Sequence, residues 1–167
     1  KKCRSAKIFL DCVKFCKKRK INISSTAFFY SAIKLGKDVQ LTCSRLGIVP
    51  KAIQNDIKNY LEKNIGQNFS EDGFSDNFRK LIESALKIAI YRKKQNIGEK
   101  EILVALSTED EFFKKILVNL DLKKEDVENL TLWLDSAERM IIENKKFWTY
   151  ENLLRQGSMG KDFASGY

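Results

Sequence analysis

An internal repeat constrains this chain more than any other feature of its sequence. The stretch CVKFC at residues 12–16 matches ALKIA at residues 85–89, an offset of 73 positions. After one inserted residue the offset becomes 74, and it then holds for three further pairs of segments: 22–23 with 96–97, 28–29 with 102–103, and 46–48 with 120–122. Self-similarity at a fixed offset indicates that a unit of about 70 residues has been duplicated.

The apolar spacing within each copy is helical. Apolar residues occupy positions i, i+4, i+7 and i+8 in the first helix of each copy: Ile8, Cys12, Phe15 and Cys16, then Leu81, Ala85, Ile88 and Ala89. The first copy predicts helices over 5–20, 25–35, 38–46 and 50–64, and the second over 75–94, 99–106, 110–120 and 123–144. Ser24 suits an N-cap, Gly47 a C-terminal stop and Pro50 a first helical turn. A single Pro and only eight Gly argue against a turn-rich β fold, so we expect an all-α fold.

The repeat also predicts the domain organisation. We expect a first four-helix repeat over 1–65, a linker over 66–74, a second repeat over 75–144 and a short C-terminal connector over 145–167. A four-helix unit of this size buries little core alone, so the two tandem repeats should pack together as a pseudo-twofold pair. Six aromatic residues have the bulk to fill the two cores: Phe9, Phe28, Phe29, Tyr30, Phe112 and Phe113.

Composition excludes several classes of function. The chain lacks His, which removes His-based triads and mixed Cys/His zinc sites. No run approaches the ~20 apolar residues that span a bilayer, and the start does not resemble a signal peptide, so we expect a cytoplasmic protein without a membrane partner. We find no acid/base pair that would support catalysis. The GSMGK segment at residues 157–161 is too short for a phosphate-binding loop.

The four cysteines are Cys3, Cys12, Cys16 and Cys43, and they form no paired C-x-x-C motif. Cys12 and Cys16 lie on one face of a helix, where the second copy has Ala85 and Ala89. We therefore expect small buried side chains and no metal site.

Positive charge leaves a second interpretation open. The net charge is +9, and basic clusters end the first helix of each copy at residues 17–20 and 92–94. Cations near a helix C-terminus interact favourably with the helix dipole, which is a sufficient structural reason for both clusters. The alternative is a freestanding basic helical adaptor or a nucleic-acid-binding protein, although no recognised nucleic-acid motif is present.

The second copy carries a resemblance to a known family. It reads FRKLIESALKIA over residues 78–89, NIGEKEILVAL over 96–106 and ILVNLDL over 116–122. These segments resemble the repeat of the Clp ATPase N-terminal domain, and with the first copy the resemblance covers about residues 5–135. The segments FWTYENLLR at 147–155 and GKDFASGY at 160–167 resemble the connector that leads to the first AAA+ module of Clp unfoldases.

The resemblance implies a docking role. It implies that these residues receive protein substrates or adaptor proteins for a hexameric, ATP-driven unfoldase, and a peptidase is a candidate partner of that hexamer. No catalysis or cofactor is expected within this chain, because ATP and Mg are implied only for separate ATPase modules.

The resemblance also points to two corners where a loop meets a helix. In related proteins a Glu at this corner of each repeat is implicated in recognising phosphorylated arginine, and its positions correspond to Thr26 and Lys100. Neither residue is acidic, which argues against phospho-arginine recognition, since a guanidinium group pairs with a carboxylate. The candidate partner-binding residues remain Ser25, Thr26, Glu99 and Lys100. Exposed N–H groups together with Lys100 would suit an anion.

Overall fold

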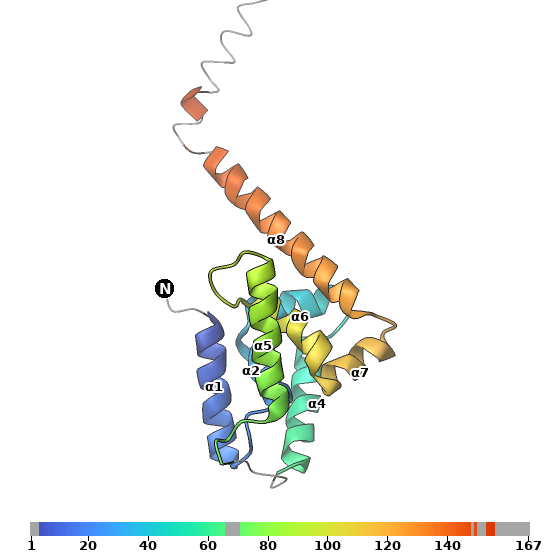
Figure 1. The fold of residues 1–167 in the computed structure, drawn as a ribbon. Helices are drawn as coiled ribbons and strands as arrows, with labels where there is room; N and C mark the ends of the chain where they lie inside the picture. The colour runs from blue at the N-terminus through green and yellow to red at the C-terminus, as the bar shows by residue number, and fades with distance from the viewer. Residues whose placement is uncertain (1–3, 66–70, 148, 150–152, 156–167) are drawn as a thin grey trace, which may run out of the picture. The chain divides into compact units, whose positions relative to one another are not determined.

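The computed structural model describes residues 4–65, 71–147, 149 and 153–155, and its named elements are all α-helices (Figure 1). The helices, in chain order, are α1 (Arg4–Arg19), α2 (Ser25–Leu35), α3 (Lys37–Arg45), α4 (Pro50–Lys63), α5 (Asp76–Tyr91), α6 (Glu99–Glu109), α7 (Glu111–Asn119) and α8 (Lys124–Phe147). The only β-type pairing among these residues is an isolated bridge between Ile23 and Phe74. The predicted all-α class is confirmed.

The helix starts follow the predicted caps. Helix α2 has the predicted limits, and the Ser24 hydroxyl accepts a hydrogen bond from the Ala27 N–H at 3.1 Å, as an N-cap does. Pro50 occupies the first turn of α4, where its missing N–H costs nothing. Helix α6 begins after Gly98 as predicted but extends to Glu109 instead of residue 106, because the Asp110 N–H still bonds to the Leu106 carbonyl.

Four helix ends share one geometry. A residue just beyond each end has a positive φ. It is Lys20 (54°), directly after α1, and the second residue after α3, α5 and α7: Gly47 (87°), Lys93 (56°) and Asp121 (56°). In each case the next N–H bonds back to a carbonyl of the last helical turn: Ile21 to Cys16, Ile48 to Cys43, Lys94 to Ala89, and Leu122 to Leu117. The left-handed turn at Lys93 ends α5 at Tyr91, three residues before the predicted end. Lys20 and Lys93 are 73 residues apart, and Gly47 and Asp121 are 74 residues apart. These are the two offsets of the sequence repeat.

Two short helices form the centre of the core. Residues 25–33 of α2 and 99–107 of α6 are all buried, whereas α1, α4, α5 and α7 bury a single face each. The rings of Phe29 and Phe113 meet edge to face with centroids 4.9 Å apart. Phe9 and Phe112 are only partly buried and pack against this core from outside.

The chain forms two compact units. The first spans Lys1–Thr131 and the second spans Leu132–Tyr167, so the boundary lies within α8. The described part of the second unit is mainly the remainder of α8, and it exposes Trp133, Met140 and Ile141. None of the described helices has the length and apolar character that a membrane span requires.

Candidate functional site

The first predicted corner, at the start of α2, is closed by a carboxylate from the other half of the chain. The Ser25 and Thr26 hydroxyls both donate to Asp110 Oδ1, at 2.7 and 2.6 Å. Asp110 is also the N-cap of α7, because its Oδ2 accepts from the Phe113 N–H at 2.9 Å. All of these groups are buried, so the hydroxyls are used for internal packing.

Asp110 is a buried carboxylate held by three donors. Burial raises the pKa of its carboxyl group, while hydrogen bonds from Thr26, Ser25 and the Phe113 N–H act in the opposite direction. A carboxylate in this position is tolerated because its lone pairs are satisfied.

The second predicted corner, at the start of α6, is also closed. Glu99 Oε1 accepts from the Asp38 N–H at 3.2 Å, and Glu99 Oε2 lies 3.7 Å from the Arg4 guanidinium. Burial raises the pKa of the Glu99 carboxyl, and the nearby Asp38 charge adds to that effect. Glu99 also approaches Gly36 so closely that a Cβ atom there would lie 2.3 Å from Oε1.

Lys100 does not provide a free cation at this corner. Its side chain is 8% exposed, and Nζ lies 3.7 Å from Asp38 Oδ2. The first residues of α6 are buried, so the structure gives no support to the expectation that exposed N–H groups and Lys100 together receive an anion. The charge of Lys100 is neutralised within the fold, and the α6 start is packed against α3.

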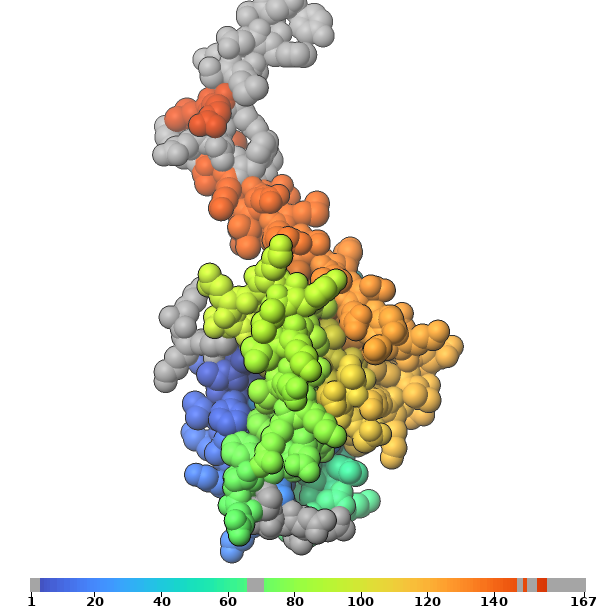
Figure 2. Space-filling view, viewed as in Figure 1, coloured from blue at the N-terminus to red at the C-terminus, as the bar shows by residue number. Residues whose placement is uncertain are grey.

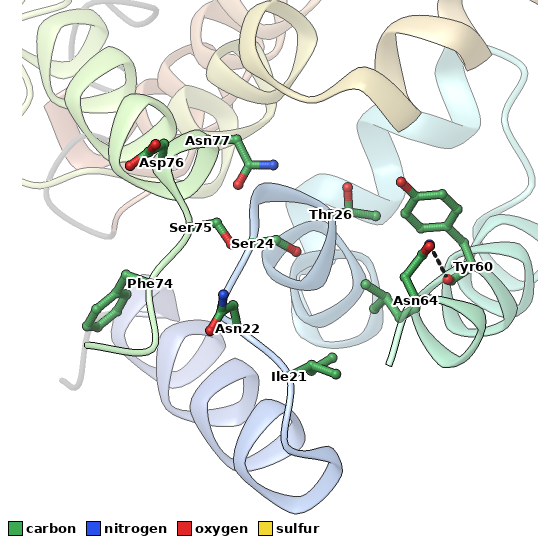
Figure 3. Close-up of a pocket in the computed structure, with 11 residues that line it drawn as sticks. Ile21, Asn22, Ser24, Thr26, Tyr60, Asn64, Phe74, Ser75, Asp76 and Asn77 are labelled. Carbon is green, nitrogen blue, oxygen red and sulfur yellow. Dashed lines mark hydrogen bonds between the residues drawn. The ribbon is translucent and has the colours of Figure 1, made fainter. Parts of the chain in front are cut away.

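A pocket of about 430 Å³ opens beside the first corner, where the start of α2, the end of α4 and the start of α5 meet (Figure 3). Of the four predicted residues, only Thr26 lines it. The lining residues are Ile21, Asn22, Ser24, Thr26, Tyr60, Leu61, Asn64, Phe74, Ser75, Asp76 and Asn77. Figure 3 shows Thr26 near Tyr60 on one side, with Asn77 on the side of α5.

The pocket carries neutral hydrogen-bonding groups. Asn77 Oδ1 accepts a hydrogen bond from the Ser25 N–H at 3.2 Å. This bond uses the oxygen of the Asn77 side-chain amide and does not involve its N–H₂ group. Asn64 Nδ2 donates to the Tyr60 carbonyl at 2.8 Å, drawn as a dashed line in Figure 3. Among the described residues, the lining contains neither Cys nor Lys, and Asp76 supplies its one carboxylate. Such a surface suits hydrogen bonding to a polar peptide better than bond-making chemistry.

A second cavity of about 540 Å³ lies between α1 and the segment before α5. Its walls include Phe9, Val13 and Phe74, with Lys17 and Lys20 among its lining residues. The segment is held in place by main-chain bonds, in which the Ile23 N–H donates to the Gly73 carbonyl at 2.8 Å and the Ser75 N–H donates to the Ile23 carbonyl at 3.0 Å.

The cysteines of the described residues are buried thiols. Cys12, Cys16 and Cys43 are free, and the predicted burial of Cys12 and Cys16 is confirmed. Hydrogen bonding to Cys16 and burial raise the pKa of Cys12, and burial raises the pKa of Cys43 to about 12. No group of three or more potential metal-ligating side chains occurs among the residues described. Cys3 and the 157–161 segment lie outside those residues, as does most of the predicted connector.

Comparison with known proteins gives no family for this chain. A scan against protein-family models finds no match, and a search of curated proteins finds no related sequence.

Sequence reasoning did not find three residues that shape the site. Asp110 was recognised only as the start of a helix, and Asn64 and Asn77 were not singled out. The N-cap preference of Asp gave a local signal for Asp110. Its bond to Thr26, 84 residues earlier in the chain, depends on tertiary packing.

Proposed function

We propose that this chain is a protein-docking module built from two tandem four-helix repeats packed as a pseudo-twofold pair. The observation that supports the pairing most directly is a reciprocal set of contacts. Ser25 of the first copy bonds to Asp110 of the second copy. At the 74-residue offset, the residue equivalent to Ser25 is Glu99, and the residue equivalent to Asp110 is Gly36. Glu99 lies directly against Gly36. A twofold interface requires such an exchange, in which residue i of one copy meets residue j of the other and the reverse.

The equivalent helix ends support the same proposal. The left-handed turns after α1 and α5, and those after α3 and α7, recur at the offsets of the sequence repeat. The two buried helices, α2 and α6, also occupy equivalent places in the two copies.

We further propose that the module serves an ATP-dependent unfoldase of the Clp type in the cytoplasm. The basis for this step is the sequence resemblance over residues 5–135. In this role the chain receives protein substrates or adaptors and has no catalysis of its own. ATP, Mg and any peptidase partner belong to other parts of such an assembly.

The pocket in Figure 3 is the docking surface we favour for an extended segment of a partner protein. Its amide and hydroxyl groups can pair with a peptide main chain, while Tyr60 and Phe74 provide apolar contact. Phospho-arginine is not the expected ligand, because Thr26 bonds to Asp110 and Lys100 faces Asp38.

Casein labelled with fluorescein tests the docking function by fluorescence anisotropy. The double variant Tyr60→Ala, Asn64→Ala should weaken casein binding about fivefold, the effect of losing about 1 kcal/mol of contact. The double variant Glu62→Ala, Lys63→Ala is the matched control, since both residues are exposed on the same helix outside the pocket. Failure of the unmodified chain to bind casein, or equal binding by both variants, would count against the proposal.

The second candidate function is nucleic-acid binding. It is favoured by the exposure of Lys17, Lys18 and Lys20 at the end of α1. Filter binding to duplex DNA between 50 and 200 mM salt separates it from protein docking, because contacts to several phosphates lower the affinity steeply over about that range.

A further inference from the structure

The second half of α5 carries an exposed apolar stripe, made of Leu86, Ile90 and Tyr91. Leu86 is 49% exposed, Ile90 is 67% exposed and Tyr91 is 88% exposed. Leu86 and Ile90 are four positions apart and therefore share one face of the helix, with Tyr91 beside them. Figure 2 shows α5, in green, uncovered over much of the face in view.

The fold does not require apolar side chains at the end of this stripe. With the 73-residue offset, Ile90 and Tyr91 correspond to Lys17 and Lys18 of α1. Both lysines are exposed. The same helix of the first copy therefore ends with charges where the second copy has large apolar groups.

Several lysines lie near the stripe along the same helix. Lys80, Lys87, Lys93 and Lys94 are exposed along α5 and just beyond its end. One acidic residue, Glu83, lies among them and pairs with Lys87 at 3.2 Å. These four lysines, called the lysine rim below, outnumber the one acidic residue among them, so this part of α5 carries a net positive charge.

We propose that this stripe is a docking surface for an acidic amphipathic helix of a partner protein. Apolar residues of that helix would cover Leu86, Ile90 and Tyr91, and its Asp and Glu side chains would meet the lysine rim. A membrane surface is a poorer match, because the apolar area covers little more than one helical turn, whereas interfacial helices bury a long apolar face.

The inference rests on the proposed docking function but concerns a separate surface. The pocket of Figure 3 includes only Asp76 and Asn77 of α5. Leu86 lies nine residues further along the helix, about 14 Å at 1.5 Å per residue. Variants can therefore remove one surface and leave the other intact.

The test uses two labelled 16-residue helix-forming peptides. One carries Leu at positions i, i+3, i+4 and i+7 with Glu elsewhere, and the other has Lys in place of each Glu. The full chain should bind the Glu peptide in 50 mM salt and bind the Lys peptide at least about tenfold more weakly.

The decisive variant is Ile90→Lys, Tyr91→Lys, which gives α5 the residues of the first copy. It adds positive charge, so purely electrostatic binding of the Glu peptide would become tighter. We expect binding to weaken about tenfold instead, because the apolar contact is lost. Both positions are exposed, and circular dichroism checks that the variant remains helical. The pocket variant Tyr60→Ala, Asn64→Ala should bind the Glu peptide like the unmodified chain.

Three results would overturn the inference. They are equal binding of the two peptides, unchanged or tighter binding by the lysine variant, and binding to vesicles of phosphatidylserine and phosphatidylcholine without binding to the Glu peptide. If casein binds at the pocket and the Glu peptide does not bind, this inference alone fails. If the Glu peptide binds and casein does not, the proposed pocket function fails.

Discussion

Thr26 Oγ1 lies 2.6 Å from Asp110 Oδ1 and links the start of α2 to the junction between α6 and α7. Both residues are buried, and Asp110 also caps α7. One carboxylate thus fixes a helix start in each half of the chain. This link explains why a corner that was expected to receive a partner is filled from within.

Gly36 should tolerate a methyl group less well than Gly98. A Cβ at Gly36 would lie 2.3 Å from Glu99 Oε1 and 2.6 Å from the Ala32 carbonyl oxygen, which belongs to the backbone. At Gly98 the closest atom, at 2.8 Å, is the end of the Glu101 side chain, which can rotate away. We expect Gly36→Ala to reduce the free energy of unfolding by about 1–3 kcal/mol and Gly98→Ala by less than about 1 kcal/mol. Urea unfolding measures both, and equal losses would mean that the close approach of Glu99 to Gly36 is unimportant.

Glu99 should make the protein less stable as pH rises. Burial raises the pKa of Glu99 in the folded state, so the native state binds more protons than the unfolded state between the ordinary pKa of 4.5 and the raised folded pKa. Stability from this group is therefore present at low pH and is lost as pH rises through the folded pKa. The unfolding free energy of the unmodified chain, minus that of Glu99→Gln, should fall between pH 4 and 7. A difference that increases over this range would contradict the assignment, and Glu111→Gln, at an exposed position, is the control.

Cys12 should accept a smaller side chain more readily than a larger one. It is fully buried in α1, and its counterpart in the second copy is Ala85, which is also fully buried. We expect Cys12→Ala to cost less than about 1.5 kcal/mol and Cys12→Leu to cost about 1–3 kcal/mol through overpacking. Thermal unfolding of both variants, with and without a chelator, provides the measurement. A larger loss for Ala than for Leu, or a change with chelator, would show that packing is not the role of this thiol.

The helix limits that the sequence predicts correctly depend on residues that act locally. Ser24, Gly47 and Pro50 act through their own backbone conformation and nearby groups, and the structure places helix ends at all three. Lys93 gave no such signal, because residues other than Gly rarely adopt the left-handed conformation that follows α5 there.

The site was harder to predict because its residues act across the two halves. Lys100 appears in the sequence as one of many lysines, and its burial against Asp38 follows from the packing of α6 on α3. The pocket lining likewise combines residues from three helix ends, the start of α2, the end of α4 and the start of α5.

The central claim is that these corner contacts hold the two halves of the chain together around the docking surface. A double-mutant cycle with Thr26→Ala and Asp110→Ala tests it most directly by urea unfolding. Asp110→Ala should cost about 2–4 kcal/mol, from the lost cap and the unpaired buried hydroxyls, and the coupling between Thr26 and Asp110 should be about 0.5–2 kcal/mol. Additive losses, with no coupling between the two residues, would contradict the account.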